Sequence, residues 1–275
     1  MLFYRCPADK KAQNMTQFLH PAAEQGFSTA AKLYQQVRPS YPQALVAWLK
    51  NQLKSDAAPV CVDLGAGTGK FLPILQQLSP HVIAVEPVAE MLAQLQQHYP
   101  DVQSIQAYSH ALPLPDASVD AVCCAQSFHW FANLETLSEI YRVLKPGGQL
   151  LLIWNQRDTR IDWVKALAEH IAPLEGDTPR FHSDQWRQVF SAATGFNANA
   201  EATFQQWQSG TVEQVVSKRL LSTSFIAALP EHQQQQQLKQ QFEQMVLQYT
   251  GKQPQQQIDF PYLTHVYSFT KITEQ

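Results

Sequence analysis

The sequence is poor in features that mark several classes of protein. Charged residues make up 16% of the 275 residues and the net charge is −3, so no overall basic field can gather nucleic acid. No apolar run reaches the roughly 18 residues of a membrane span, and the first residues lack the apolar segment of a signal peptide. The four cysteines show no metal-ligand spacing, and two of them are adjacent in an apolar run, as core thiols are (Cys6, Cys61, Cys123 and Cys124). These absences predict a cytoplasmic protein that binds neither nucleic acid nor a membrane.

Hydrophobic residues make up 45% of the chain, as in ordinary globular proteins. The first 14 residues show no clear period, and we expect residues 1–26 to be a flexible segment. Met15 is a better candidate than Met1 for the translation start, a hypothesis that N-terminal mass analysis would test. Helical spacing then predicts helices at 27–37 and 42–53, separated by Arg38-Pro39-Ser40-Tyr41-Pro42.

The stretch Val60 to Gly69 reads V-C-V-D-L-G-A-G-T-G, and the rest of the chain is organised around it. A short apolar run predicts a buried strand, Asp63 closes it with a carboxylate, and three glycines alternate before a helical pattern at 71–78. Glycines at a strand-to-helix turn let the backbone approach a ligand where a Cβ would collide. The turn therefore predicts a site for a nucleotide-like ligand.

Strand and helix patterns alternate along the next 90 residues. Four further strands are expected at 81–86, 102–108, 119–126 and 149–154, with helices at 88–98 and 134–144. Five strands with helical crossovers predict an α/β fold, a parallel sheet covered on both faces. Beyond it, helical patterns occupy 162–171, 183–193, 211–221 and 231–249, and strand patterns 196–207 and 263–269.

The glycine spacing distinguishes two kinds of ligand. A dinucleotide fingerprint, G-x-G-x-x-G, needs its third glycine at position 70, but that residue is Lys70, which argues against an NAD or FAD oxidoreductase. A tight turn without a ligand remains an alternative. Glu86 ends the next strand 21 residues after Gly65, where an acidic side chain can accept hydrogen bonds from both ribose hydroxyls.

Four separated blocks carry a family resemblance: V-D-L-G-A-G-T-G-K-F, V-I-A-V-E-P, L-P-L-P-D-A-S-V-D and R-V-L-K-P-G-G. Together they resemble the class I S-adenosylmethionine (SAM)-dependent methyltransferases, of the type 11 domain, over roughly residues 27–155. Two further blocks, R-P-S-Y-P and A-Q-S-F-H-W-F, resemble a small-molecule group that includes trans-aconitate-type carboxyl methyltransferases. The resemblance implies SAM as cofactor.

The same resemblance implies a Rossmann-like, doubly wound, mostly parallel seven-stranded sheet with an antiparallel closing strand. Residues 27–275 would form the methyltransferase domain. Its parts would be a helical lid at 27–55, a SAM-binding core at 56–156 and a C-terminal half at 157–275. That half would carry a helical cap at about 211–257, and we expect specificity in segments 157–195 and 211–257.

Site roles are implied by the resemblance. Asp63 would face the SAM ammonium, Glu86 the ribose, and Gln126 the methionine end. The other residues implied in SAM binding are Tyr34 and Arg38 of the lid, Gly65, Ala66, Gly67 and Gly69 of the turn, and Pro87, Val88, Tyr108 and Ser109 around the adenine. Tyr108 departs from the small polar residue usual in the family. Arg38 suits the SAM carboxylate, although a solvated arginine is an equal alternative.

The acceptor side is less defined. A general base is needed only for a protonated acceptor, and His129 is the candidate, with a histidine bonded to backbone as the alternative. A carboxylate acceptor needs no base, and Arg157, Arg160, Arg180 and Arg219 could orient it. We expect a small-molecule acceptor, with a SAM-binding module without turnover and an enzyme acting on protein or RNA as alternatives. Neither the atom methylated nor the oligomeric state can be predicted from the sequence.

Overall fold

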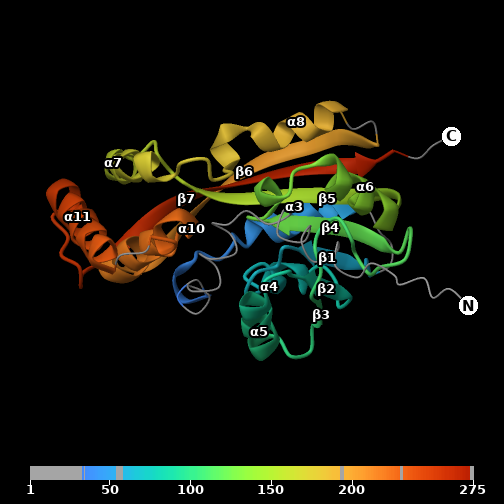
Figure 1. The fold of residues 1–275 in the computed structure, drawn as a ribbon, viewed down its shortest axis with the longest axis horizontal. Coiled ribbons are helices and arrows are strands. Elements are labelled where there is room, and N and C mark those ends of the chain that lie inside the picture. Colours follow the sequence, from blue (N-terminus) through green and yellow to red (C-terminus); the bar gives the residue numbers. More distant parts are fainter. Residues whose placement is uncertain (1–32, 34, 54–57, 193–194, 230–231, 273–275) are drawn as a thin grey trace, which may run out of the picture.

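A computed structural model describes residues 33, 35–53, 58–192, 195–229 and 232–272. Its centre is a seven-stranded sheet in the order β3-β2-β1-β4-β5-β7-β6 (Figure 1). The first five strands are parallel: β1 (Cys61–Leu64), β2 (Val82–Val85), β3 (Gln103–Ile105), β4 (Val119–Ala125) and β5 (Leu144–Arg157). The strand β7 (Gln257–Lys271) runs antiparallel to both β5 and β6 (Phe196–Thr211). The seven-stranded, mostly parallel sheet with an antiparallel closing strand is thereby confirmed.

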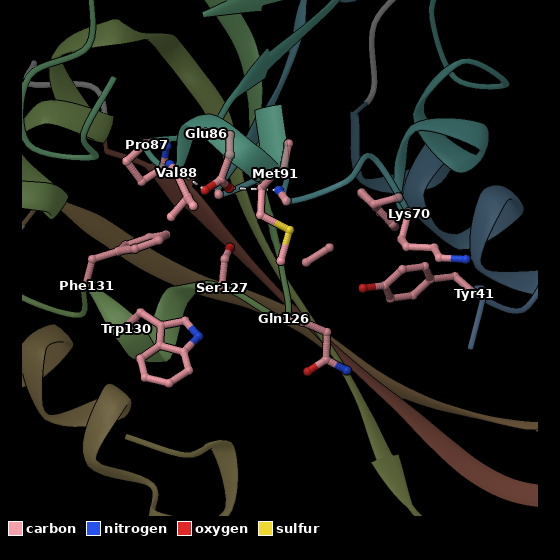
Figure 2. A pocket seen from close by; sticks show the side chains of 15 residues that line it. Tyr41, Lys70, Glu86, Pro87, Val88, Met91, Gln126, Ser127, Trp130 and Phe131 are labelled. Atoms are coloured by element: carbon pink, nitrogen blue, oxygen red, sulfur yellow. Dashed lines mark hydrogen bonds between the residues drawn. The ribbon is translucent and has the colours of Figure 1, made fainter. Parts of the chain in front are cut away.

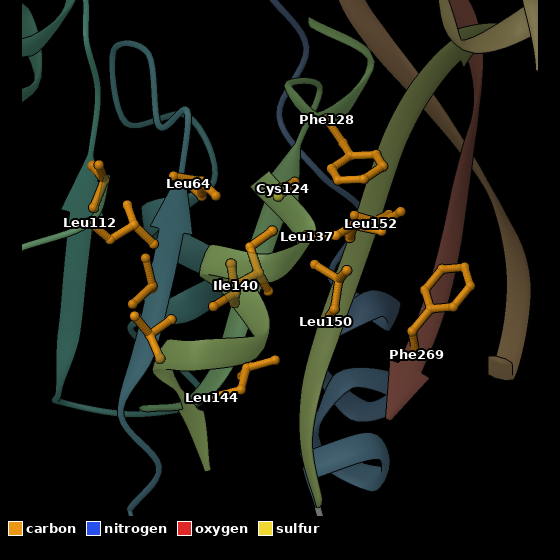
Figure 3. Packing of buried hydrophobic residues seen from close by; sticks show 14 of the residues in the cluster. Leu64, Leu112, Cys124, Phe128, Leu137, Ile140, Leu144, Leu150, Leu152 and Phe269 are labelled. Atoms are coloured by element: carbon orange, nitrogen blue, oxygen red, sulfur yellow. The ribbon is translucent and has the colours of Figure 1, made fainter. Parts of the chain in front are cut away.

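Helices cover both faces of the sheet because successive strand residues point to opposite sides. On one face, Cys61, Ala84 and Cys123 pack against α3 (Ala44–Leu53), α4 (Leu72–Leu75) and α5 (Ala89–His98). On the other, Val62 and Cys124 pack against α6 (Leu134–Val143) and α8 (Gln185–Ala192). Figure 3 shows Leu137 and Ile140 of α6 over this second face. The three described cysteines are buried free thiols, as expected of core residues.

A third cluster of buried side chains holds the cap to the far end of the β6–β7 pair. The cap consists of α7 (Asp162–Ile171), a π-helix (Glu213–Lys218), α9 (Arg219–Leu221), α10 (Ser224–Ala227) and α11 (His232–Thr250). Its core joins Leu167, Val216 and Phe242 to Phe260 and Tyr262 of β7. Figure 1 shows α7, α10 and α11 gathered around this end of the β6–β7 pair. None of the described helices is both long and apolar enough to cross a membrane.

Several boundaries differ from the sequence expectation. The strand expected at 102–108 is only Gln103–Ile105, an edge strand that pairs on one side alone. The strand β5 begins at Leu144 instead of 149, because Leu144 pairs with Val119 before the ladder shifts register and resumes at Gln149. The expected helix at 211–221 is a π-helix followed by α9, and Thr211 belongs to β6. The expected N-terminal segment, 1–26, and most of helix 27–37 lie outside the described residues.

Candidate functional site

Two cavities adjoin at the carboxyl ends of the parallel strands, where open α/β sheets bind ligands. The first, about 670 Å³ including its opening to solvent, lies over the glycine turn between β1, β2 and β4 (Figure 2). The second, about 580 Å³ on the same basis, lies between β5 and the cap. Gln126 and Trp130 line both cavities. A molecule in one cavity can therefore meet a molecule in the other across these two side chains.

The glycine turn is held close to the loop after β4. Gly65 has a φ of +70°, and a Cβ built on it would lie 2.6 Å from the Cβ of Ser127. The Ser127 hydroxyl donates a hydrogen bond to the carbonyl of Leu64 (2.6 Å), and the N–H of Gly65 donates to the carbonyl of Val85 (2.8 Å). Both the left-handed backbone and the close approach therefore require glycine at this position.

Replacing Gly65 by alanine is expected to lower the stability of the free protein by about 2–4 kcal/mol, since backbone strain and a steric clash both contribute. Gly147→Ala is the matched control, because Gly147 has a φ of +74° but nothing within 4 Å of an added Cβ. Thermal or urea unfolding of the two variants measures the difference. Equal losses for both would contradict the close contact with Ser127.

Gly69 has a different role from Gly65. Its φ is +83°, and an added Cβ would lie 2.8 Å from the ring of Tyr99 and 2.9 Å from Leu72. Gly69 does not line either cavity, whereas Gly65, Ala66 and Gly67 all line the first. The third glycine thus packs the turn against the following helices.

Two buried carboxyl groups flank the glycine turn, of which Glu86 lines the first cavity and Asp63 lines neither cavity. Glu86 accepts hydrogen bonds from the backbone N–H of Gly67 (2.8 Å) and of Val88 (2.9 Å), one at each oxygen. Asp63 is fully buried behind the turn, and neither of its oxygens has a hydrogen-bond partner among the described residues. Burial raises the pKa of Asp63 to about 8, with the Glu86 charge adding to it, and burial raises the pKa of Glu86 to about 7 despite its two N–H donors.

These carboxyl groups are poised for a ligand that supplies positive charge and hydroxyl groups. A buried carboxylate without a partner costs free energy that a bound cation can recover. Glu86, whose backbone partners use one lone pair on each oxygen, can still accept a hydroxyl at each.

The rest of the first cavity has an apolar wall that the sequence analysis did not assign to a ligand. Figure 2 shows Met91, Phe131 and Trp130 around it, and Lys70 beside Tyr41. Desolvation lowers the pKa of the Lys70 ammonium. A flat apolar ring system would fit against such a wall.

The other residues predicted to bind SAM fall into three groups. Pro87, Val88 and Gln126 line the first cavity. Tyr108, which stacks on His110, and Ser109, whose hydroxyl is 2.8 Å from that of Thr136, line neither cavity. Tyr34 lies outside the described residues. Their contacts with a cofactor stay predictions.

Gln126 is strained at the junction of the two cavities. Its φ is +63°, which is uncommon for a residue with a side chain. Two hydrogen bonds to β5 hold this conformation. The backbone N–H donates to the carbonyl of Ile153 and the side-chain Nε2 donates to that of Asn155, both at 2.8 Å.

The second cavity is lined by four arginines from four separate segments, and we call it the arginine cavity: Arg38, Arg157, Arg180 and Arg219. Burial lowers the pKa of Arg157 to about 10, helped by the charges of Arg219 and Arg180. Glu175 lies 3.6 Å from Arg180, while no carboxylate lies within ion-pair distance of Arg157 or Arg219 among the described residues. Such a cluster of partly buried cations can hold an anion.

The structure separates residues that the sequence had grouped. Arg38 lines the arginine cavity instead of the first one, and its Nη2 donates to the carbonyl of Ser222 (2.8 Å). The exposed Arg160 pairs with the buried Asp158 at 2.7 Å and lines neither cavity. His129 lines the arginine cavity, and its hydrogen-bond partner is the Trp154 indole instead of the backbone. No group of metal-ligating side chains occurs in the described part of the chain.

Known proteins resemble this chain in sequence and in fold. Residues 62–152 match a family model described as a methyltransferase domain. An uncharacterized methyltransferase-like protein of Schizosaccharomyces pombe is 39% identical over 76% of this chain and 81% of its own length. An uncharacterized methyltransferase of the same yeast is 34% identical over 90% of this chain and 97% of its own length. A candidate type II methyltransferase from Anaeromyxobacter dehalogenans shares the fold, with a TM-score of 0.67 and 21% identity over 86% of this chain and 99% of its own.

Proposed function

Because the chain belongs to the class I SAM-dependent methyltransferases, we propose that it methylates a small anionic molecule, with a carboxylic acid as the acceptor class. The observation that carries the proposal is the arginine cavity, which adjoins the first cavity across Gln126 and Trp130. An acceptor held by those arginines would lie beside the cofactor. A cavity of about 580 Å³ suits a small molecule better than a polypeptide or RNA segment.

The first cavity fits SAM by its own chemistry. Asp63 offers a buried carboxylate that has no partner in the described part of the chain, and Glu86 offers an acceptor at each oxygen for the ribose hydroxyls. The apolar wall at Met91 and Phe131 suits the adenine. SAM supplies an activated methyl group on its sulfonium, so the protein needs mainly to align the acceptor and exclude water.

A carboxylate acceptor needs no general base, because it is already ionised at neutral pH. Arg157, Arg180 and Arg219 would hold it by charge-assisted hydrogen bonds and fix which oxygen faces the first cavity. Trp130, which lines both cavities, would help to exclude water from the transfer. The products would be a methyl ester and S-adenosylhomocysteine.

The finer placement, among trans-aconitate-type carboxyl methyltransferases, is part of the same proposal. It is supported by the blocks R-P-S-Y-P and A-Q-S-F-H-W-F, which contribute Arg38, Gln126, His129 and Trp130 to the arginine cavity. The proposed partner is therefore a small acidic metabolite, and neither nucleic acid nor a membrane has a part in the reaction.

The test is product identification with purified protein, SAM and a panel of mono-, di- and tricarboxylic acids, phenols and amines. We expect S-adenosylhomocysteine and a base-labile methyl ester from an acid, with little turnover of phenols and amines. Turnover of tRNA or protein alone would overturn the small-molecule proposal. Binding of SAM by calorimetry without turnover of any acceptor would favour a SAM-binding module.

A further inference from the structure

His129 lies in a single turn of 3₁₀ helix, Phe128–Trp130, directly after β4, and its half-buried ring lines the arginine cavity. The Nε1 of Trp154 is 3.0 Å from the Nδ1 of His129. An indole N–H can only donate a hydrogen bond, so Nδ1 must be the acceptor and carry no proton. In a neutral imidazole, the proton then resides on Nε2.

The indole that imposes this arrangement is itself fixed. Trp154 is fully buried in β5, with ring centroids 4.6 Å from Trp186 and 4.9 Å from Phe181. Close packing of aromatic rings on this scale leaves no room for a different rotamer. His129 therefore cannot exchange its tautomer without losing the hydrogen bond to Trp154.

The surroundings also keep the ring neutral. Burial lowers the pKa of His129 to about 3, and the positive charges of Arg180, Arg38 and His182 add to the effect. Glu175, the carboxylate in this neighbourhood, faces Arg180 and His182 instead of the His129 ring. A second proton would also place an N–H on Nδ1 against the N–H of Trp154.

We propose that His129 is a fixed hydrogen-bond donor that binds the acceptor's anionic group through Nε2–H and does not act as a general base. The inference rests on the proposed function for the identity of the acceptor, but the tautomer itself does not. A neutral donor adds a contact to the anion without adding a fifth positive charge to four arginines. It also disfavours amines, because their N–H groups would meet N–H and guanidinium donors.

The first arm of the test needs no acceptor. Two-bond ¹⁵N–¹H spectra of histidine-labelled protein report which ring nitrogen carries the proton, and the His129→Gln spectrum identifies the His129 signals. We expect the Nε2–H tautomer, unchanged between about pH 5.5 and 8, where an ordinary histidine titrates. A proton on Nδ1, or titration in this range, would overturn the proposal.

The second arm is kinetic, on an acceptor identified by the panel. His129→Ala is expected to raise the KM for the acceptor about 10- to 50-fold, with kcat and SAM affinity little changed, because a hydrogen bond to a charged group is lost. His129→Gln, whose amide can accept from Trp154 and donate to the acceptor, should recover most of this loss. The pH profile of kcat/KM should keep its shape in both variants.

A general base would give a different pattern. Its removal typically lowers kcat by 10²- to 10⁴-fold, and glutamine could not restore it. That result, or loss of a pH-profile limb in the alanine variant, would refute the donor role. If no acid is turned over by the unmodified enzyme, the proposed function fails, while the spectra still decide the tautomer.

Discussion

Glu86→Ala is expected to weaken SAM binding at least about 100-fold, since each hydrogen bond from a hydroxyl to a charged acceptor contributes about 1.5–3 kcal/mol. Glu86 lines the first cavity and is oriented by the N–H groups of Gly67 and Val88. Calorimetric titration with SAM measures the loss. Glu90→Ala is the matched control, because Glu90 is an exposed carboxylate on α5, four residues further along the chain.

The alanine variant could lose SAM affinity only because its turn is reshaped, since alanine leaves two backbone N–H groups without an acceptor. Comparing the affinities for S-adenosylhomocysteine and for its 2′-deoxy analogue separates this effect from the loss of the ribose contacts. The unmodified protein should prefer the ribose form strongly, and Glu86→Gln should lose most of the preference. A preference that survives in the glutamine variant would show that the ribose hydroxyls bind elsewhere.

The same carboxyl groups predict a pH signature for the unmodified protein. Their pKa values are raised to about 7 for Glu86 and about 8 for Asp63, so both are largely protonated at pH 6. Binding of hydroxyls and of an ammonium requires the ionised forms, so SAM should release protons and bind more tightly as the pH rises from about 6 to 7.5. At most, affinity rises about tenfold per pH unit for each proton released.

The stability of the free protein should change in the opposite direction. The folded state holds these protons more tightly than the unfolded state, so their contribution is complete below about pH 4 and is lost as the pH rises through 7 and 8. The difference between the melting temperatures with and without SAM should therefore grow as the pH rises. A difference that does not change with pH would contradict the assignment of these two groups to the cofactor.

The features predicted well from sequence are those whose cause is local. The glycine turn and Glu86 could be located because a strand, a turn and the next strand end bring them together within about 20 residues. Asp63 could be named, but its lack of a hydrogen-bond partner among the described residues arises from the packing of β1 between β2 and β4, which spacing does not encode. The shift to Leu144 at the start of β5 likewise depends on pairing with Val119.

The arginine cavity shows what the sequence leaves undetermined. Its four arginines come from the segment before α3, the end of β5, the loop before α8 and the start of α9, and they meet only in the folded chain. Arg157 and Arg160 are three residues apart and indistinguishable in sequence, yet one lines the cavity and the other is exposed and pairs with Asp158. The tautomer of His129 depends in the same way on Trp154, which lies 25 residues away.

This difference between two neighbouring arginines supports the second large prediction. Arg157→Gln is expected to lower kcat/KM for the acceptor about 100-fold, because truncating one partner of a desolvated ion pair costs about 2–5 kcal/mol. The SAM affinity should not change, since Arg157 does not line the first cavity. Arg160→Gln removes the same charge from the surface and should leave both parameters within about twofold.

Arg157→Lys separates charge from geometry. A lysine keeps the positive charge but loses the planar pair of donors that can bind both oxygens of a carboxylate, so most of the loss should remain. Full recovery in the lysine variant would show that Arg157 acts as a point charge.

Stability provides the independent check on Arg157, because a residue kept for binding often destabilises the empty site. Its guanidinium lies near Arg180 and Arg219, and both charges help to lower its pKa. Arg157→Gln should therefore raise the melting temperature of the acceptor-free protein while weakening acceptor binding, and Arg160→Gln should do neither. A variant that loses both activity and stability would instead identify Arg157 as part of the framework of β5, and the anion would have to be held by the remaining residues of the cavity.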